Sequence, residues 1–137
     1  MVVTSLTSLD LNAVNNIVPS QRQSDIDATG TTTTDAAAVL LNVDGRFTSR
    51  HGFSVRNIHA SNVAQWQVWG SLSDSATAPV QADASWVSLK ALGDIAANNG
   101  TDSFSIVDSI WAWFKIEIKA KVGGSQGTVQ IWHRGRL

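Results

Sequence analysis

The chain has 137 residues, of which 43% are hydrophobic and 15% are charged, and its formal net charge at pH 7 is −1. This length fits one domain, and the weak charge argues against a nucleic-acid partner, because nucleic-acid binders carry basic patches that neutralise phosphates. The sequence contains no cysteine, so disulfides and thiolate metal ligands are both excluded.

The first ten residues lack the basic start and the apolar run of a signal peptide. No stretch is apolar over the roughly 20 residues that a membrane-spanning helix needs. We therefore expect a soluble protein that is made in a cytoplasm and has no membrane partner.

Residues 1–35 differ in pattern from the rest and predict an N-terminal arm beside a main domain over residues 36–137. Their apolar side chains lie among Ser, Thr and Asn and follow neither the helical nor the strand period. One alternative is that the arm packs along its own domain as an edge strand. The other is that it reaches another subunit, since about 30 extended residues span up to ~100 Å. The arm residues predicted to contact a partner are Leu6, Leu9, Leu11, Val14 and Ile17.

The main domain begins with an apolar run over residues 36–43, which predicts a strand. Asp44 and Gly45 follow it and indicate a hairpin turn, because Gly adopts positive φ without a Cβ clash. Gly52 interrupts the next apolar pattern and predicts a bulge or bend before a strand over residues 53–59.

Residues 64–73 alternate between apolar and polar side chains, as a half-buried strand does. The alternation places Trp66 on the inner face and Trp69 on the outer, polar face. Another strand is predicted around residues 84–91. Residues 92–100 are expected to form a short helical turn that ends at the Asn-Asn-Gly sequence.

The clearest strand covers residues 110–122, where apolar and charged side chains alternate. Phe114 and Ile116 share the inner parity. Lys115 and Glu117 share the outer parity and are expected to form a solvated ion pair, since exposed pairs of this kind are common. After it, glycines in residues 123–127 predict the last hairpin turn, and a final strand follows.

Tryptophan is the unusual aromatic here, with six Trp and no Tyr. Two explanations are open: loops or the arm cover these side chains, or they form an association surface for a protein or for sugar rings. Arg134 and Arg136 at the basic C-terminus are further candidates, because guanidinium groups clamp carboxylates. The tryptophans predicted to lie on polar faces are Trp69, Trp111, Trp113 and Trp132.

Seven or eight short strands separated by turn signals predict an all-β fold, an antiparallel β-sandwich of jelly-roll-like type with an extended N-terminal arm. Catalytic chemistry is not indicated. The histidines His51, His59 and His133 lack metal-ligand spacing, and Glu117 is the only Glu. We therefore expect no enzymatic activity, no catalytic or metal site and no cofactor.

From Phe53 to the C-terminus, about 60% of the chain, the sequence resembles β-sandwich capsid decoration (cement) proteins of tailed bacteriophages. That resemblance implies a homotrimer that binds the major capsid protein on the virion surface, bridges neighbouring capsomers and is made in the host cytoplasm. The N-terminal arm would grip the capsid or an adjacent subunit. The segments that carry the resemblance are residues 66–74, which begin Trp-Gln-Val-Trp-Gly-Ser, the Trp-Val-Ser-Leu sequence from Trp86, residues 113–121 and residues 127–132.

The same order of segments is similar to discoidin-type carbohydrate-binding modules. That alternative implies a glycan partner on the host, although such modules often carry a disulfide and this chain has no cysteine. A tail or fibre component of similar fold is the third hypothesis.

Overall fold

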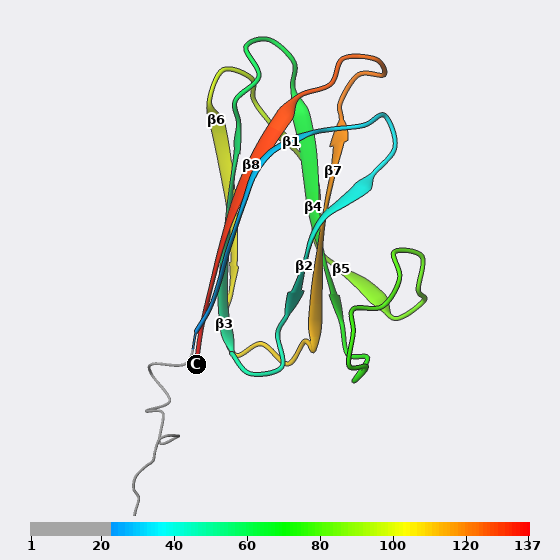
Figure 1. Cartoon of the computed structure of the whole chain (residues 1–137), viewed down its shortest axis with the longest axis vertical. Helices are drawn as coiled ribbons and strands as arrows, with labels where there is room; N and C mark the ends of the chain where they lie inside the picture. The colour runs from blue at the N-terminus through cyan, green and yellow to red at the C-terminus, as the bar shows by residue number, and fades with distance from the viewer. Residues whose placement is uncertain (1–22) are drawn as a thin grey trace, which may run out of the picture.

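The computed structural model describes residues 23–137, which form two four-stranded antiparallel sheets packed face to face (Figure 1). One sheet has the order β1-β8-β3-β6 and the other β2-β7-β4-β5. The strands are β1 (Gln23–Thr32), β2 (Ala38–Asp44), β3 (Arg50–Asn57), β4 (Ala64–Ser71), β5 (Trp86–Ile95), β6 (Gly100–Ile106), β7 (Trp113–Ala120) and β8 (Thr128–Arg136).

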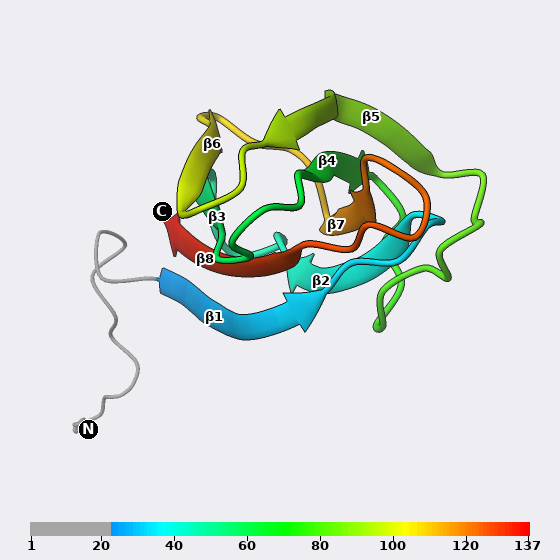
Figure 2. The same ribbon diagram turned by 90° about the horizontal axis from the view of Figure 1, so that it is seen from above.

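This strand order is a jelly roll, so the predicted fold class is confirmed. Consecutive strands lie in opposite sheets, with the exception of β4 and β5, which are neighbours in one sheet. Figure 2 shows the two layers from above, with β1 and β2 along one side and β5 and β6 along the other. No helix occurs within residues 23–137.

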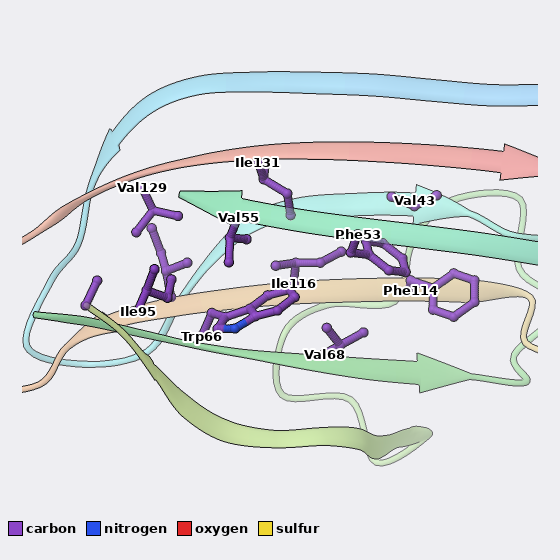
Figure 3. Packing of buried hydrophobic residues seen from close by; sticks show 12 residues of the cluster. Val43, Phe53, Val55, Trp66, Val68, Ile95, Phe114, Ile116, Val129 and Ile131 are labelled. Carbon is purple, nitrogen blue, oxygen red and sulfur yellow. The ribbon is translucent and has the colours of Figure 1, made fainter. Parts of the chain in front are cut away.

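The core lies between the sheets and is built from the inward parity of the strands (Figure 3). Trp66 on β4 is its largest fully buried side chain, and Phe53 and Phe114 pack with ring centroids 5.5 Å apart. The Trp66 Nε1 donates a 2.8 Å hydrogen bond to the Asp102 carboxylate, which satisfies the polar end of the buried indole. Burial of each large apolar side chain contributes roughly 1.5–3 kcal/mol.

Residues 23–32, which the sequence assigns to the arm, form the edge strand β1 and pair with β8. The sandwich therefore begins at Gln23 rather than at residue 36, and for these residues the edge-strand alternative holds. Ile26 and Ala28 pack against the core, which explains why this segment joins the sheet. Residues 1–22, with the five predicted contact residues of the arm, lie outside the described part of the chain.

Both predicted hairpins are wrong, because the glycines serve connections that cross between the sheets. β2 and β3 lie in opposite sheets, and so do β7 and β8. A Cβ at Gly45 would lie 2.6 Å from the Trp111 carbonyl oxygen and 2.8 Å from the Phe114 ring, so glycine is needed there for close approach. At Gly45 the glycine is required by packing rather than by a tight turn. Residues 122–125 do form a tight local turn, in which Gly124 has a φ of 76° and the Ser125 N–H donates to the Val122 carbonyl at 2.9 Å.

Two further predictions are corrected. β5 continues to Ile95, so residues 92–95 are strand rather than helical turn, and Asn98 and Asn99 reverse the chain with positive φ. Gly52 lies within an unbroken register between β3 and its neighbours β6 and β8, so it marks no bulge.

We predict that Gly45→Ala lowers the free energy of unfolding by about 1–3 kcal/mol, because the added methyl group overlaps the Trp111 carbonyl and the Phe114 ring. Gly52→Ala is the matched control, since a Cβ there meets no atom within 4 Å. Urea denaturation of the two variants measures the difference. Equal stabilities would contradict the close approach at Gly45.

Candidate functional site

The outer face of the β2-β7-β4-β5 sheet is covered by the connection between β4 and β5, residues 72–85. Trp86 Nε1 donates to the Val80 carbonyl at 2.9 Å, and Trp113 Nε1 donates to the Ser75 carbonyl at 3.1 Å. Gln81 reaches the sheet itself, because its side-chain amide donates to Glu117 at 2.8 Å. The indoles thus hold the loop through their N–H groups.

Lys115 lies beneath this loop. Its Nζ is 4.9 Å from the ring centroids of both Trp69 and Trp86, donates to the Gln81 carbonyl at 2.8 Å and lies 3.2 Å from a Glu117 carboxylate oxygen. An ammonium over two indoles is attracted by the negative faces of the rings. Lys115 and Glu117 are only 3% and 4% exposed, so the predicted solvated ion pair is wrong.

Four donors surround the Glu117 carboxylate. Gln67 and Trp69 each donate to Oε1 at 2.8 Å, and Gln81 and Lys115 bond Oε2. Burial alone raises the pKa of this carboxyl. The hydrogen bonds from Gln81, Lys115 and Trp69 and the charge of Lys115 outweigh burial, so the pKa of Glu117 lies below its ordinary value.

The predicted outward tryptophans separate into three environments. Trp113 is bonded by the loop, so the alternative of cover by loops holds for it. Trp69 is half-buried and contacts Glu117 and Lys115 of the neighbouring strand. Trp111 precedes β7 and packs at the core, where a Cβ on Gly70 would lie 2.6 Å from its ring. The strand parity does not extend to it, because the strand begins at Trp113. Trp132 alone is half-buried on the outer face of the other sheet.

A buried histidine pair was missed by sequence reasoning. His51 Nδ1 and His133 Nε2 lie 3.0 Å apart, and His51 Nε2 donates to the Thr48 carbonyl at 3.1 Å in the tautomer this arrangement favours. The His51 ring lies 4.6 Å from that of Phe114. The sequence did carry a sign of this pair. His51 has the same strand parity as Phe53, so its imidazole points into the core.

Burial lowers the pKa of His51, and the hydrogen bond to the Thr48 backbone only partly opposes that effect.

Within residues 23–137 no group of three or more metal-ligating side chains occurs. In the same part of the chain no helix is long and apolar enough to cross a membrane.

A hollow of about 480 Å³ is lined by residues 45–49, residues 109–111 and Leu137. Figure 1 shows the start of β3 and the C-terminus at the same end of the sandwich. Phe47, Ile110 and Leu137 line the hollow and are 62%, 74% and 36% exposed. Its two loops are fixed to each other and to the fold. The Gly45 N–H donates to the Ala112 carbonyl at 2.8 Å, and the Ser109 N–H donates to the Ser49 carbonyl at 2.8 Å.

The two predicted arginines lie on the outer face of β8, near Trp132 and away from the covered tryptophans. Arg134 Nη1 bonds the Asp27 carboxylate on β1 at 2.6 Å. Arg136 Nη1 donates to the Gly135 carbonyl at 2.7 Å. The structure therefore brings Trp132, Arg134 and Arg136 together on one sheet face, whereas Trp69, Trp111 and Trp113 lie elsewhere.

No protein-family model and no curated protein matches the chain. Among solved structures it is similar to the Bacillus endospore appendages, described as a family of disulfide-linked pili, with a TM-score of 0.51 and 11% identity over 94% of this chain and 99% of that chain. At this identity the likeness shows a shared fold.

Two viral capsid structures are more distant. A picornavirus capsid chain, from equine rhinitis A virus, aligns with a TM-score of 0.43 and 14% identity over 100% of this chain and 81% of that chain. The VP2 subviral particle of infectious bursal disease virus gives a TM-score of 0.44 and 12% identity over 97% of this chain and 37% of that chain. Both likenesses are too weak to carry an argument about this protein.

We predict that Lys115→Met lowers the free energy of unfolding by about 3 kcal/mol, because it leaves the buried Glu117 carboxylate without its cation. The double variant with Glu117→Gln should recover much of the loss. Lys121→Met is the control, since Lys121 pairs with Asp94 at the surface. If Lys115→Met cost no more than this control in urea denaturation, the buried pair would not hold the loop.

We also predict two acid-sensitive windows in stability. Unfolded His51 takes up a proton near pH 6.5 but folded His51 only at lower pH, so stability falls as pH drops below about 6.5. Glu117 stabilises the fold above its ordinary pKa of 4.5, and this contribution is lost as pH falls through its lower folded pKa. Thermal unfolding from pH 8 to 3 measures both. His51→Gln should reduce the loss of stability below pH 6.5, and Glu117→Gln should reduce the loss at lower pH. If either variant kept the pH dependence of the wild type, the assignment of that pH range to its residue would be wrong.

Proposed function

We propose that this chain is a virion structural protein that binds the outside of a phage capsid as a homotrimer and stabilises contacts between capsomers. Its partner is the major capsid protein, it is made in the host cytoplasm, and it acts without catalysis. The observation that carries the proposal is the apolar end of the sandwich, lined by Phe47, Ile110 and Leu137.

Monomeric proteins rarely gather large exposed apolar side chains around one hollow, because such a patch drives association. Phe47, Ile110 and Leu137 come from three separate segments, and backbone hydrogen bonds fix the loops that bear the first two. A surface that is already ordered loses little conformational entropy when it binds. These properties support an assembly contact at this end.

The start of the described chain lies at the same end. Gln23, the first residue of β1, pairs with Arg136, the neighbour of Leu137. The N-terminal end of β1 therefore lies near the apolar hollow that Leu137 lines. This placement supports a role in the same contact for the predicted arm residues Leu6, Leu9, Leu11, Val14 and Ile17.

The mechanism is passive. Contacts that exist only in the assembled shell stabilise that shell, because a ligand favours the state it binds. In a trimer, three weak contacts act together through effective concentration. The endospore appendages of similar fold are described as disulfide-linked, but this chain has no cysteine, so disulfides cannot join its copies.

We predict that Ile110→Asp converts the trimer into monomers, because it places a charge in the apolar contact. Val80→Asp is the matched control: Val80 is 73% exposed, as Ile110 is 74% exposed, but lies on the loop at residues 72–85. Size-exclusion chromatography with light scattering gives the mass of each variant. Deletion of residues 1–22, which leaves β1 intact, should likewise weaken the trimer.

Three results would count against this proposal. A wild-type chain that stays monomeric at high concentration would exclude a stable trimer. Filaments in negative-stain images would favour an open, pilus-like assembly over a closed trimer. A trimer that survives both Ile110→Asp and the deletion would move the contact away from this end.

A further inference from the structure

The outer face of the β1-β8-β3-β6 sheet carries a shallow furrow that runs along β3. The register sets its two cross-sections: Ser54 lies between Trp132 and Ser103, and Gly52 lies between Arg134 and Ser105. The hollow over these residues measures about 240 Å³, and a second of about 280 Å³ continues it towards Arg50. We call this the β3 furrow. Its lining outward residues are Gly52, Ser54, Ser103, Ser105, Trp132 and Arg134.

Gly52 has no structural need to be glycine. An added Cβ meets no atom within 4 Å, and among the described glycines the backbone at 52 is not one with positive φ. By contrast, a Cβ at Gly45 or Gly70 would meet neighbours at 2.6 Å. Glycine inside a strand weakens the strand and often marks a bulge, a tight bend, or a place where a ligand or another backbone approaches closely. The unbroken register at Gly52 excludes a bulge, and approach by a ligand is consistent with the open space there.

The walls of the furrow supply three kinds of contact. Trp132 offers an indole, whose large apolar surface packs against a ring. Ser54, Ser103 and Ser105 are exposed, and their hydroxyls both donate and accept hydrogen bonds. The Arg134 guanidinium, set in place by Asp27, matches the geometry of a carboxylate or phosphate.

Arginine side chains outnumber carboxylates on this face. Four of the six arginines in the sequence, Arg50, Arg56, Arg134 and Arg136, lie on the outer face of the adjacent strands β3 and β8. The register also places Asp25 and Asp27 of β1 on this face, opposite Arg134 and Trp132, so arginines outnumber carboxylates on these strands by four to two. A cationic face on a chain of net charge −1 favours an anionic partner.

We infer that the β3 furrow is a binding site for an acidic glycan, a linear chain of sugar rings that carry carboxylates. One pyranose ring packs its C–H face on Trp132, its hydroxyls bond the serines, and the arginines bind the carboxylates. Gly52 keeps the floor low enough for the ring. This site does not depend on the assembly proposed above.

Single-stranded nucleic acid, the other anionic polymer with stacking rings, fits less well. Proteins that bind it stack successive bases on several aromatic side chains. Phe53 and Phe104 also line the β3 furrow but pack towards the core, so among the described residues Trp132 is the one aromatic side chain on its outer face. The adjacent small side chains are serines that suit sugar hydroxyls. The glycan is therefore the partner that the furrow favours.

Isothermal titration calorimetry with hexagalacturonate tests the site on the full chain, with cellohexaose as the neutral sugar and oligothymidylate as the nucleic acid. We expect binding of hexagalacturonate that weakens with salt, and no comparable binding of the other two. Gly52→Val should weaken it about tenfold or more by filling the floor, while Tm does not fall, since Val suits a strand. Arg134→Gln should weaken it about fivefold.

Matched controls lie close by. Thr101→Val changes the same sheet face, outside the lining residues of the furrow, and Arg46→Gln removes an arginine from another part of the surface. Both should bind as the wild type does. Absence of hexagalacturonate binding, equal affinity for cellohexaose, tighter binding of oligothymidylate, or unchanged affinity in a folded Gly52→Val variant would each overturn the inference. The oligomeric state of Gly52→Val should equal that of the wild type, which separates this test from that of assembly.

Discussion

Two sheets that each have one apolar face depend on each other, because neither face is stable in water alone. The chain satisfies this constraint by sending almost every connection across to the opposite sheet, so that the fold closes through contacts between residues far apart in sequence. Phe53 and Phe114, from different sheets, meet in the resulting core. The loops at the ends are consequences of these crossings, and several exposed apolar residues, among them Phe47, Val107 and Ile110, lie on them.

The two outer faces of the sandwich differ in how they meet solvent. One is covered by the chain itself, since the β4–β5 connection lies over Lys115, Glu117 and their tryptophans. The polar groups there are paired and buried, so that face stabilises the fold. The opposite face has no such cover in the described chain and carries Trp132 among small side chains and arginines. A binding surface is thus more readily assigned to the second sheet than to the first.

Local sequence patterns predicted what depends on local geometry. The period of two placed Phe114 and Ile116 in the core, and the number of short strands indicated a jelly roll. The wrong predictions concern two features that strand parity does not encode. One is which loop covers an outer face, as for Lys115. The other is which sheet the next strand joins, as after Gly45. A turn glycine and a close-approach glycine look identical in sequence, because both lack a side chain.

The same limit explains the candidate sites. The histidine pair and the β3 furrow each join residues from strands that are distant in sequence, such as His51 with His133 and Gly52 with Arg134. A reader of the sequence sees Gly52 only as an interruption and expects a bulge there. The unbroken register removes that explanation. The open space above Gly52 leaves room for the sugar ring that we infer for the β3 furrow.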